Sequence, residues 1–448
     1  MSIKQNASLL FLAAMAMSCV LLSSGSAMGS GFAIIEQSAA SAGYAYAGVA
    51  AAAQDASTIF FNPAGMALQS GNELQLGAHY IIPKADFKNQ GSTTVLTTPL
   101  SGGNGGDGGK AAVVPNLFYM HSFSEKWTAG IGMTAPFGLT TEYDDGWVGR
   151  YHGLKSKLST LDINPSVAYK INDQWSVGVG VSIQEAKADL SNAIDYGTAL
   201  VARGLAPPSA SQNLDGKAEV DGDDWGVGAN VGLIFEPLAG TRVGVHYRSQ
   251  ISHTLEGDAN FYTPAVAAAF AQAAGLVNTT ATADVTLPDT VSISGYHAFN
   301  DRWAILADIT WTNWSLLDEL RIKFASGAAD SVTTLDWDDS WRYSLGGIFK
   351  PMEALELRAG VAFDESPIPS EQRRTPRIPG ADRTWLTFGV GYQFSEMVTV
   401  DFAYGHLFID DPKIDKDISE AENQLRGALV GEYDASVDII SASISFQF

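Results

Sequence analysis

Residues 175–184 read WSVGVGVSIQ, and this stretch decides the fold. Large apolar side chains alternate strictly with small or polar ones, so each kind falls on one face of an extended strand. A membrane-spanning strand alternates in this way, with apolar side chains toward lipid and small or polar ones toward a lumen. A soluble β-sandwich also alternates, so this stretch alone leaves both folds open.

Similar alternation returns at residues 303–312, 398–405 and 440–448. The polar face carries Gly, Ser and Thr rather than Lys and Glu, as expected of a lumen. Because lipid leaves no room for an open sheet edge, the sheet must close. The last strand ends on Phe448, which resembles the signal read by the barrel assembly machinery, so that machinery is an expected partner. Aromatic girdles at the membrane interfaces would be formed by Trp127, Trp175, Trp303, Trp311, Trp314, Trp341 and Trp385.

The connections between these segments alternate in length. Up-and-down transmembrane barrels have short periplasmic turns and long extracellular loops. The pattern predicts an all-β membrane protein, an antiparallel transmembrane β-barrel of about fourteen strands with periplasmic termini. The short connections are 122–126, 172–174, 237–240, 300–301, 351–354 and 395–396, and the long ones are 141–157, 191–215, 258–280, 318–333, 365–382 and 410–433.

Composition and the N-terminus place the chain in the outer membrane of a Gram-negative bacterium. Residues 1–29 are predicted to be a cleaved signal peptide, with Lys4 before an apolar run at 9–22 and small residues near position 29. The only cysteine, Cys19, lies in this segment, so disulfides and thiolate metal sites are excluded from the mature chain. The net charge of −22 argues against nucleic acid as a partner.

Residues 30–70 differ from the rest of the chain because they are rich in Ala, Gly and Ser. Small residues suit a compact segment packed against a barrel wall. We therefore expect an N-terminal hatch, or plug, at 30–70 inside the lumen and a barrel at 71–448.

Several motifs lie along the mature chain. They are SGF at 30–32, NPA at 62–64, FGLTTE at 137–142, YRS at 247–249, WR at 341–342, RAGVAFDESPIP at 358–369 and DRTW at 382–385. Together they resemble the FadL/TodX family of outer-membrane transporters for long-chain fatty acids and other hydrophobic compounds. The resemblance implies a fourteen-stranded barrel plugged by an N-terminal hatch, which would include Phe32, Asn62, Pro63 and Ala64.

The resemblance also implies a lateral exit, made by an inward kink in the third strand. That strand is expected at about 126–140, with the kink and the lateral gate at Pro136, Phe137 and Gly138. Proline lacks the amide that a ladder needs, and glycine packs nothing, so pairing is weak there. The alternative is an ordinary bulge at the barrel rim.

The loops at 191–215 and 258–280 are candidates for ligand capture. Exposed apolar side chains in an extracellular loop predict a binding surface. The alternative is that the two loops only pack on each other. The predicted ligand-binding side chains are Leu200, Val201, Leu205, Phe261, Val266 and Phe270.

Cations in the lumen could bind a carboxylate. Alternation points Arg342, Arg358 and Arg383 inward on three successive strands, and Lys187 and Arg248 are further candidates. The alternative is a structural ladder of arginines and acids across the wall.

The substrate class stays open from the sequence. Two basic positions that the resemblance associates with the carboxylate fall on Asn192 and Asp338, which leaves room for an uncharged substrate. We expect passive uptake of a long-chain fatty acid or hydrocarbon, captured at the loops and released sideways past the hatch. The alternatives are a plugged or open general diffusion porin, or a channel for aromatic hydrocarbons.

The seven histidines are scattered, without a serine elbow or metal-ligand spacing nearby. We therefore expect no enzyme activity, no catalytic residue, no metal and no cofactor. The other expected partners are the hydrophobic ligand, outer-membrane lipid and lipopolysaccharide, and the barrel is expected to be a monomer.

Overall fold

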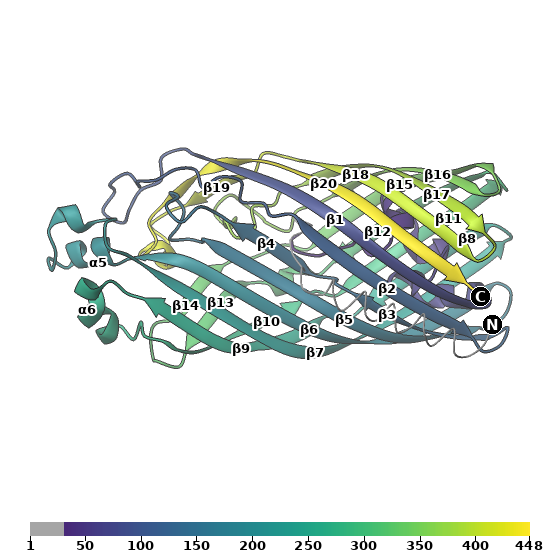
Figure 1. The fold of residues 1–448 in the computed structure, drawn as a ribbon, viewed down its shortest axis with the longest axis horizontal. Coiled ribbons are helices and arrows are strands. Elements are labelled where there is room, and N and C mark those ends of the chain that lie inside the picture. Colours follow the sequence, from purple (N-terminus) through teal and green to yellow (C-terminus); the bar gives the residue numbers. More distant parts are fainter. Residues whose placement is uncertain (1–30) are drawn as a thin grey trace.

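The computed structural model describes residues 31–448 (Figure 1). The predicted signal peptide lies outside the described residues. Strand β1 pairs with β2 on one side and with β20 on the other, so the sheet closes. The result is the predicted all-β architecture, a closed antiparallel barrel of 14 strands.

Residues 31–448 contain 20 strand segments, because some wall strands are interrupted and the connection between two paired wall strands, β12 and β15, carries two short strands of its own. The segments β3 and β4 both pair with β5, and β8 and β9 both pair with β7. The segments are β1 (Asn72–Asn89), β2 (Ala112–Ser122), β3 (Trp127–Thr134), β4 (Gly138–Glu142), β5 (Lys155–Lys170), β6 (Trp175–Asp195), β7 (Asp215–Leu238), β8 (Thr241–Arg248), β9 (Ile251–Tyr262), β10 (Thr279–Leu287), β11 (Thr290–Asn300), β12 (Trp303–Thr312), β13 (Glu319–Phe324), β14 (Ser331–Thr334), β15 (Ser340–Met352), β16 (Leu355–Asp364), β17 (Arg383–Ser395), β18 (Val398–Ile409), β19 (Lys413–Lys416) and β20 (Leu429–Gln447).

The alternation seen in the sequence sets the two faces of the wall. In β6, Ser176 and Ser182 are buried toward the lumen, whereas Val179 and Val181 are about half exposed on the outside, at 51% and 46%. The ladder between β6 and β7 runs unbroken from Trp175 to Asp195. Such a strand satisfies its backbone within the sheet and offers lipid an apolar face.

The two ends of the barrel differ as the connection lengths predicted. The C-terminus lies at the end with short turns, and the helices α5 (Tyr196–Ala202) and α6 (Ala268–Ala273) lie at the other end (Figure 1). Two of the short turns begin at an asparagine, Asn172 or Asn300. In each turn the asparagine side-chain oxygen accepts a hydrogen bond from the backbone amide two residues later, with 2.9 Å between oxygen and nitrogen. Further short helices are η2 (Pro208–Ala210), η3 (Ala265–Ala267), η4 (Trp314–Leu316) and η5 (Ala421–Asn423).

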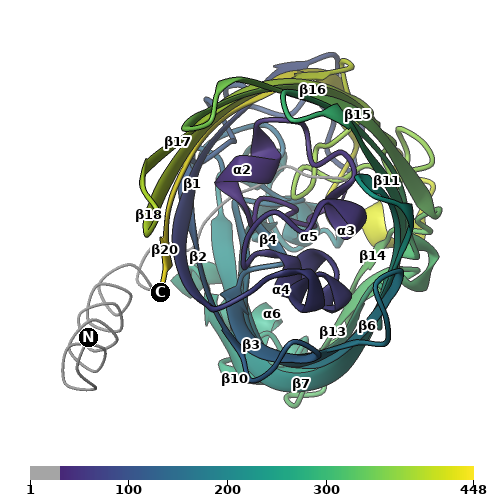
Figure 2. The ribbon, with the colours of Figure 1, turned by 90° about the vertical axis from the view of Figure 1, so that its right-hand side faces the viewer.

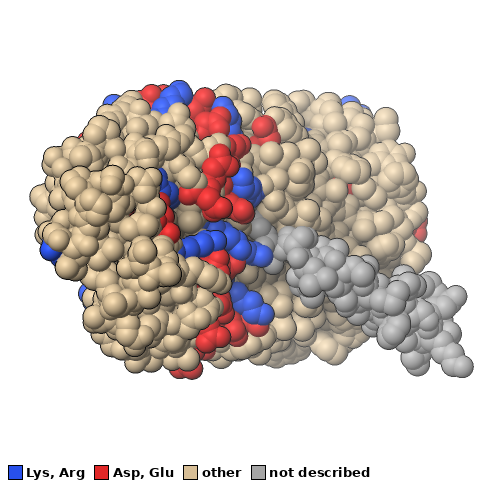
Figure 3. Space-filling view, turned by 60° about the vertical axis from the view of Figure 1, so that its left-hand side comes forward, with Lys and Arg blue, Asp and Glu red and all other residues tan. Residues whose placement is uncertain are grey.

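Charged side chains gather in one band across the face shown in Figure 3, and the barrel surface to the right of the band is largely uncharged. Exposed ion pairs such as Lys155–Asp189 lie near the long-loop ends of the strands. Of the predicted girdle residues, Trp127, Trp303 and Trp341 are exposed. The prediction is wrong for Trp314 and Trp385, which are buried. Trp385 shares the inward face of β17 with Arg383.

The N-terminal segment, residues 31–70, lies inside the barrel (Figure 2). It contains the short helices α2 (Ala39–Ala42), α3 (Val49–Ala52), α4 (Thr58–Phe61) and η1 (Pro63–Leu68). Glycines in the wall allow its close approach, since a Cβ on Gly360 would lie 2.2 Å from the carbonyl carbon of Tyr44. No helix among residues 31–448 is long and apolar enough to cross a membrane.

Candidate functional site

The third wall strand is broken at residues 135–137, between β3 and β4. The ladder between β2 and β3 ends at the pair Leu117–Met133. β4 forms a ladder with β5, and on its other side it has a single bridge, between Thr141 and Gly109, which precedes β2. The wall therefore lacks a ladder between β2 and β4. Pro136 contributes no amide at this point, which explains why regular pairing stops there.

The N-terminal segment takes up the backbone groups that the break leaves free. The Ile34 amide donates to the Pro136 carbonyl oxygen at 2.8 Å, and the Gly138 amide donates to the Phe32 carbonyl oxygen at 2.9 Å. Ala33 and Phe137 form an antiparallel bridge between these two hydrogen bonds. The three residues predicted as the gate thus all contact the N-terminal segment.

Phe32 anchors the start of this segment in an aromatic cluster. Its ring lies 4.8 Å from Trp314 and 6.1 Å from Phe137, measured between centroids. Trp337 completes the cluster at 5.9 Å from Phe32. A Cβ on Gly31 would lie within 3 Å of both tryptophans, so the chain can pass here only as glycine.

A cavity of about 130 Å³ lies behind the break. Ile34, Phe60 and Phe137 give it an apolar lining, and Arg248, Arg342 and Arg383 also line it. It touches the N-terminal segment, the broken strand and the opposite wall, so a bound molecule would contact all three. We call it the inner cavity.

Arg342 is the least satisfied cation of the inner cavity. Its Nη2 donates to the Ala45 carbonyl oxygen at 2.7 Å, but its Nε and Nη1 have no hydrogen-bond partner among residues 31–448. The guanidinium lies over the rings of Trp385 and Tyr46, at 5.1 Å and 5.9 Å. Two buried donor nitrogens are therefore left to bind something else.

The register of three strands sets the surroundings of Arg342. Asp364 of β16 lies opposite Arg342 on one side and opposite Arg383 on the other. Arg383 forms a buried ion pair with Asp364. Glu36, from the N-terminal segment and outside the spanning strands, also lines the cavity, and burial raises its pKa to about 7 although both arginines lower it.

Two other predicted cations point inward but hold carboxylates. Arg248 contacts Asp162 at 3.2 Å and lies over the ring of Phe60, at 4.5 Å. Arg358 lies nearer the short turns, in a separate cavity of about 350 Å³, and contacts Asp401 at 2.5 Å. Arg358 therefore belongs to a structural ion pair, which was the alternative that the sequence left open.

Lys187 does not lie in the lumen, and its prediction as a lumen cation is wrong. It has the same strand parity as Val181, so its side chain points to the outer face. There it pairs with Glu185 at 2.9 Å and is about half exposed.

The Asn-Pro-Ala motif fastens the N-terminal segment to the wall. The side-chain nitrogen of Asn62, Nδ2, donates to the carbonyl oxygens of Ala50 at 2.7 Å and Leu233 at 3.2 Å. Its side-chain oxygen accepts the Ala64 amide at 3.0 Å, so the side chain also caps η1, whose first residue is Pro63. Glycines 178 and 232 of the wall leave the space that this motif occupies.

The two candidate ligand loops pack on each other and also leave apolar side chains exposed. Leu200 of α5 packs in one cluster with Phe270 of α6, so the loops contact each other. Leu205 and Val266 are exposed, at 68% and 70%. Val201 is partly exposed, and Phe261 packs on Phe324 at 5.5 Å.

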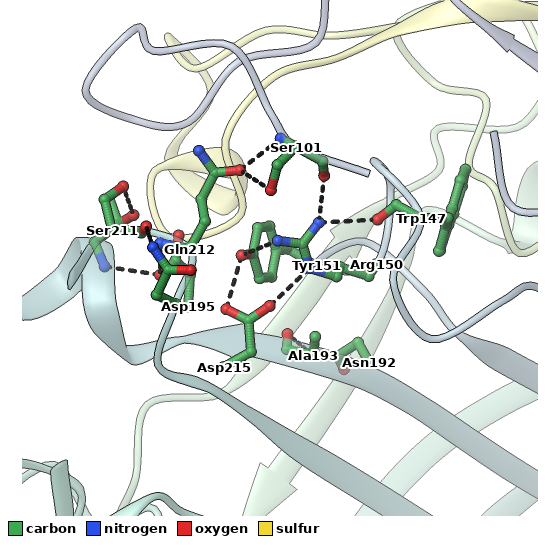
Figure 4. Close-up of polar contacts among 12 residues, drawn as sticks. Ser101, Trp147, Arg150, Tyr151, Asn192, Ala193, Asp195, Ser211, Gln212 and Asp215 are labelled. Carbon is green, nitrogen blue, oxygen red and sulfur yellow. Dashed lines mark hydrogen bonds and ion pairs between the residues drawn. The ribbon is translucent and has the colours of Figure 1, made fainter. Parts of the chain in front are cut away.

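The long loops are also tied together by Arg150 (Figure 4). Its Nε donates to Asp215 at 2.7 Å, its Nη1 to the Ser101 carbonyl oxygen at 2.8 Å, and its Nη2 to the Tyr151 hydroxyl at 2.7 Å. Three loops distant in sequence therefore converge on one buried cation.

Sequence reasoning missed Glu36, Ile34 and the inward pair Trp314–Trp337. Glu36 and Ile34 lie in a segment without periodic alternation, so nothing local signals where they point. The tryptophans follow strand ends, where an interfacial position is the usual expectation.

Comparison with known proteins gives one consistent result. Residues 20–448 match the family described as outer membrane protein transport protein (OMPP1/FadL/TodX). A "47 kDa outer membrane protein" of Pasteurella multocida is 33% identical over 395 residues, covering 87% of this chain and 90% of that protein. A "Long-chain fatty acid transport protein" of Escherichia coli is 30% identical over 403 residues, covering 87% and 89%. The crystal structure of a Pseudomonas aeruginosa FadL homologue matches with a TM-score of 0.85 at 26% identity, covering 93% of this chain and all of that one.

Proposed function

The chain belongs to the OMPP1/FadL/TodX family of outer-membrane transport proteins, and we propose that its substrate is a long-chain fatty acid. The family transports hydrophobic compounds across the outer membrane of Gram-negative bacteria. What is proposed here concerns this chain's substrate, the residues that bind it and the route of its release.

The observation that carries the proposal is Arg342, with two unpartnered donor nitrogens in a cavity of mainly apolar lining. A buried guanidinium with unpartnered donors is costly, and a carboxylate would accept a charge-assisted hydrogen bond from one of them. A fatty acid supplies such a carboxylate together with a chain for Ile34, Phe60 and Phe137. The Escherichia coli relative named for long-chain fatty acid transport supports the same class.

We further propose that the N-terminal segment is a hatch and the broken strand is a lateral gate. The support is the direct hydrogen bonding of Phe32 and Ile34 to the break at Pro136–Gly138. A ligand that displaces this contact would open the gap in the wall between β2 and β4. It could then leave through this gap toward the lipid. Phe32 and the Asn62–Ala64 motif would hold the hatch when no ligand is present.

Capture would begin at the long loops. Leu205 and Val266 are exposed apolar side chains there, and such surface favours a hydrophobic ligand. The filled lumen argues against a general diffusion porin, for which a bilayer conductance measurement is the test. We propose a monomer without enzyme activity, inserted by the barrel assembly machinery and surrounded by outer-membrane lipid and lipopolysaccharide.

The test compares the binding of oleate, a carboxylate with a long apolar chain, with the binding of hexadecane, an uncharged chain. Arg342→Gln should weaken oleate binding to the purified protein by about tenfold or more, because a charge-assisted hydrogen bond is lost. Hexadecane binding should change little, since the apolar lining is intact. Arg321→Gln, at an exposed arginine, is the matched control. Equal weakening of both ligands would indicate a structural role, and unchanged oleate binding would favour an uncharged substrate such as an aromatic hydrocarbon.

A further inference from the structure

Glu36 shares the inner cavity with three charged side chains of the wall. It lies in the N-terminal segment, is only 4% exposed, and lines the cavity together with Arg342, Asp364 and Arg383. Residues 33–35, directly before it, line the same cavity. An acidic residue of the chain itself therefore lies in the cavity whose guanidinium group we propose as the partner of a ligand carboxylate.

Glu36 is held in this place from both sides. Two residues before it, the Ile34 amide donates to the Pro136 carbonyl oxygen at 2.8 Å. Directly after it, the side-chain nitrogen of Gln37 donates to the Ala135 carbonyl oxygen at 3.0 Å, and the side-chain oxygen of Gln37 accepts the Ala135 amide at 3.4 Å. Glu36 therefore cannot leave the cavity unless the N-terminal segment gives up its contacts with the broken strand.

Two further charged groups on neighbouring strands already have partners. On β8, Arg248 lines the cavity and contacts Asp162 at 3.2 Å, so this pair is balanced. On β12, Asp308 is buried outside the cavity lining, and its two oxygens accept hydrogen bonds from hydroxyl groups. The charge of the inner cavity is therefore set by Glu36 and its three charged neighbours.

Two neutral groups near Glu36 are also titratable. His246 of β8 lines the cavity, and its Nε2 is buried without a hydrogen-bond partner among residues 31–448. The hydroxyl of Tyr46, in the N-terminal segment, is also buried, and burial raises its pKa well above the usual value. Tyr46 therefore stays neutral near neutral pH, whereas His246 is an alternative titrating group and needs a variant of its own.

The charges of the inner cavity leave room for one carboxylate. Arg383 pairs with Asp364, which leaves Arg342 to balance one further negative charge. In the free protein, ionised Glu36 supplies that charge. A ligand carboxylate at Arg342 would supply it a second time, and two buried carboxylates are costly beside one guanidinium. The cost is removed when Glu36 takes up a proton.

Near neutral pH, Glu36 is poised for this change. Burial raises its pKa from 4.5 to about 7, both arginines lower its pKa, and Asp364 raises it. A ligand carboxylate acts in the same direction as Asp364, because a nearby like charge favours the protonated form. The pKa of Glu36 is therefore higher with a carboxylate bound in the cavity than without one.

We propose that Glu36 takes up one proton from solvent when a carboxylate ligand binds in the inner cavity. The ligand stays ionised at Arg342, and the loss of charge on Glu36 compensates its negative charge. Glu36 thus makes the cavity selective against anions at alkaline pH, whereas an uncharged chain binds without a proton. This inference rests on the proposed function for its ligand, and it adds a proton and a residue that the proposed function does not need.

Oleate affinity should therefore fall as the pH rises above about 7. Below that value Glu36 is already protonated in the free protein, so its titration should change the affinity little. Above it each bound oleate takes up a proton, and the affinity should fall by up to about tenfold per pH unit.

The test counts the protons taken up when oleate binds to the purified full-length protein. Calorimetry at about pH 8 in buffers of different ionisation enthalpy should give about one proton per oleate for the unaltered protein and none for Glu36→Gln. Glu36→Asp, which restores an acid, should regain part of the uptake. Hexadecane should bind to the unaltered protein without proton uptake. Heat-modifiable migration on gels verifies that each variant is folded.

Two control variants separate Glu36 from other groups. Glu73→Gln changes a buried acid in the separate cavity near the short turns and should keep the proton uptake. His246→Gln removes the alternative titrating group and should also keep it. Uptake that persists in Glu36→Gln, or that is lost in His246→Gln alone, would overturn the assignment to Glu36.

Infrared spectra of oleate with an isotope label at its carboxyl carbon show which group carries the proton. The bound ligand should give the signal of an ionised carboxylate at about pH 8. The signal of a protonated carboxyl group would place the proton on the ligand and overturn the proposal.

This inference and the proposed function can fail separately. If Arg342→Gln weakens oleate binding but the unaltered protein takes up no proton, the proposed function stands and the coupling to Glu36 is overturned. If Arg342→Gln changes neither oleate affinity nor proton uptake, the proposed function fails. Uptake that is then still lost in Glu36→Gln would support Glu36 as the proton acceptor.

Discussion

The backbone amide of Ile34 donates a hydrogen bond to the carbonyl oxygen of Pro136, with 2.8 Å between nitrogen and oxygen. Ile34 belongs to the segment inside the lumen, and Pro136 lies in the break of the third wall strand. The hydrogen bond replaces part of a ladder that proline interrupts. Any movement of the N-terminal segment therefore changes the backbone pairing of the wall.

Locking this contact should stop transport. Ala33 and Phe137 face each other in an antiparallel bridge, where Cα atoms lie about 4.5–5.5 Å apart, within the range that a disulfide spans. Oxidised Ala33→Cys/Phe137→Cys should take up little oleate, and reduction should restore uptake to the level of the reduced variant. Each single cysteine variant is the control. Equal uptake with the disulfide formed, as verified by mass spectrometry, would exclude movement of this contact during transport.

Replacing Asn62 should loosen the N-terminal segment, and the size of the effect should depend on whether the new side chain is apolar or negatively charged. Asn62→Ala removes the hydrogen bonds to Ala50 and Leu233 and should cost about 1–3 kcal/mol of local stability. Asn62→Asp should cost more, because a carboxylate would face those carbonyl oxygens. Protease cleavage within residues 31–70 measures the effect. Aspartate tolerated as well as alanine would show that the donated hydrogen bonds matter little.

A methyl group on the wall should displace the segment without breaking the barrel. Gly360→Ala would place a Cβ 2.2 Å from the backbone of Tyr44, which cannot be relieved by rotating a side chain. Faster cleavage of the N-terminal segment is expected, with unchanged heat-modifiable migration of the barrel. Gly295→Ala is the matched control, since a Cβ there has no neighbour within 4 Å. Similar cleavage in both variants would contradict the argument from close packing.

Docking of the N-terminal segment should weaken as pH rises. Burial raises the pKa of Glu36 from 4.5 to about 7, so the docked segment keeps a proton that the released segment loses between these values. The stabilisation is full below 4.5 and is lost as pH rises toward 7. Hydrogen exchange of the segment's amides, compared with Glu36→Gln at about pH 5 and about pH 8, measures it. A pH dependence that is the same in Glu36→Gln would assign the effect to another group.

The barrel could be predicted because its constraints repeat every two residues. The strand β6 alternates over the stretch 175–184, and the predicted faces agree with the burial of Ser176 and the exposure of Val179. The break near Pro136 was also predictable, because proline and glycine disturb a ladder wherever they stand. The partner of the broken backbone was not, since Phe32 and Ile34 reach it from a segment without periodicity.

The candidate site was predictable only in part. Strand parity predicted that Arg342, Arg358 and Arg383 point inward, and all three are buried, but parity does not give their depth in the barrel. Arg342 and Arg383 lie in one row with Asp364, whereas Arg358 lies further toward the short turns and holds its own carboxylates. The prediction for Lys187 was wrong, because this residue has the strand parity of Val181 and its side chain points to the outer face.

By itself, the sequence determined the closed sheet, its two ends and the face to which most side chains point. These features follow from a local period and from connection lengths, which lipid and water impose on every strand. Only the tertiary structure decided that Arg342 keeps unpartnered donors in an apolar cavity, and that Ile34 meets Pro136. Such contacts depend on the register of distant strands and on how a nonperiodic segment fills the lumen, and no local pattern in the chain records either.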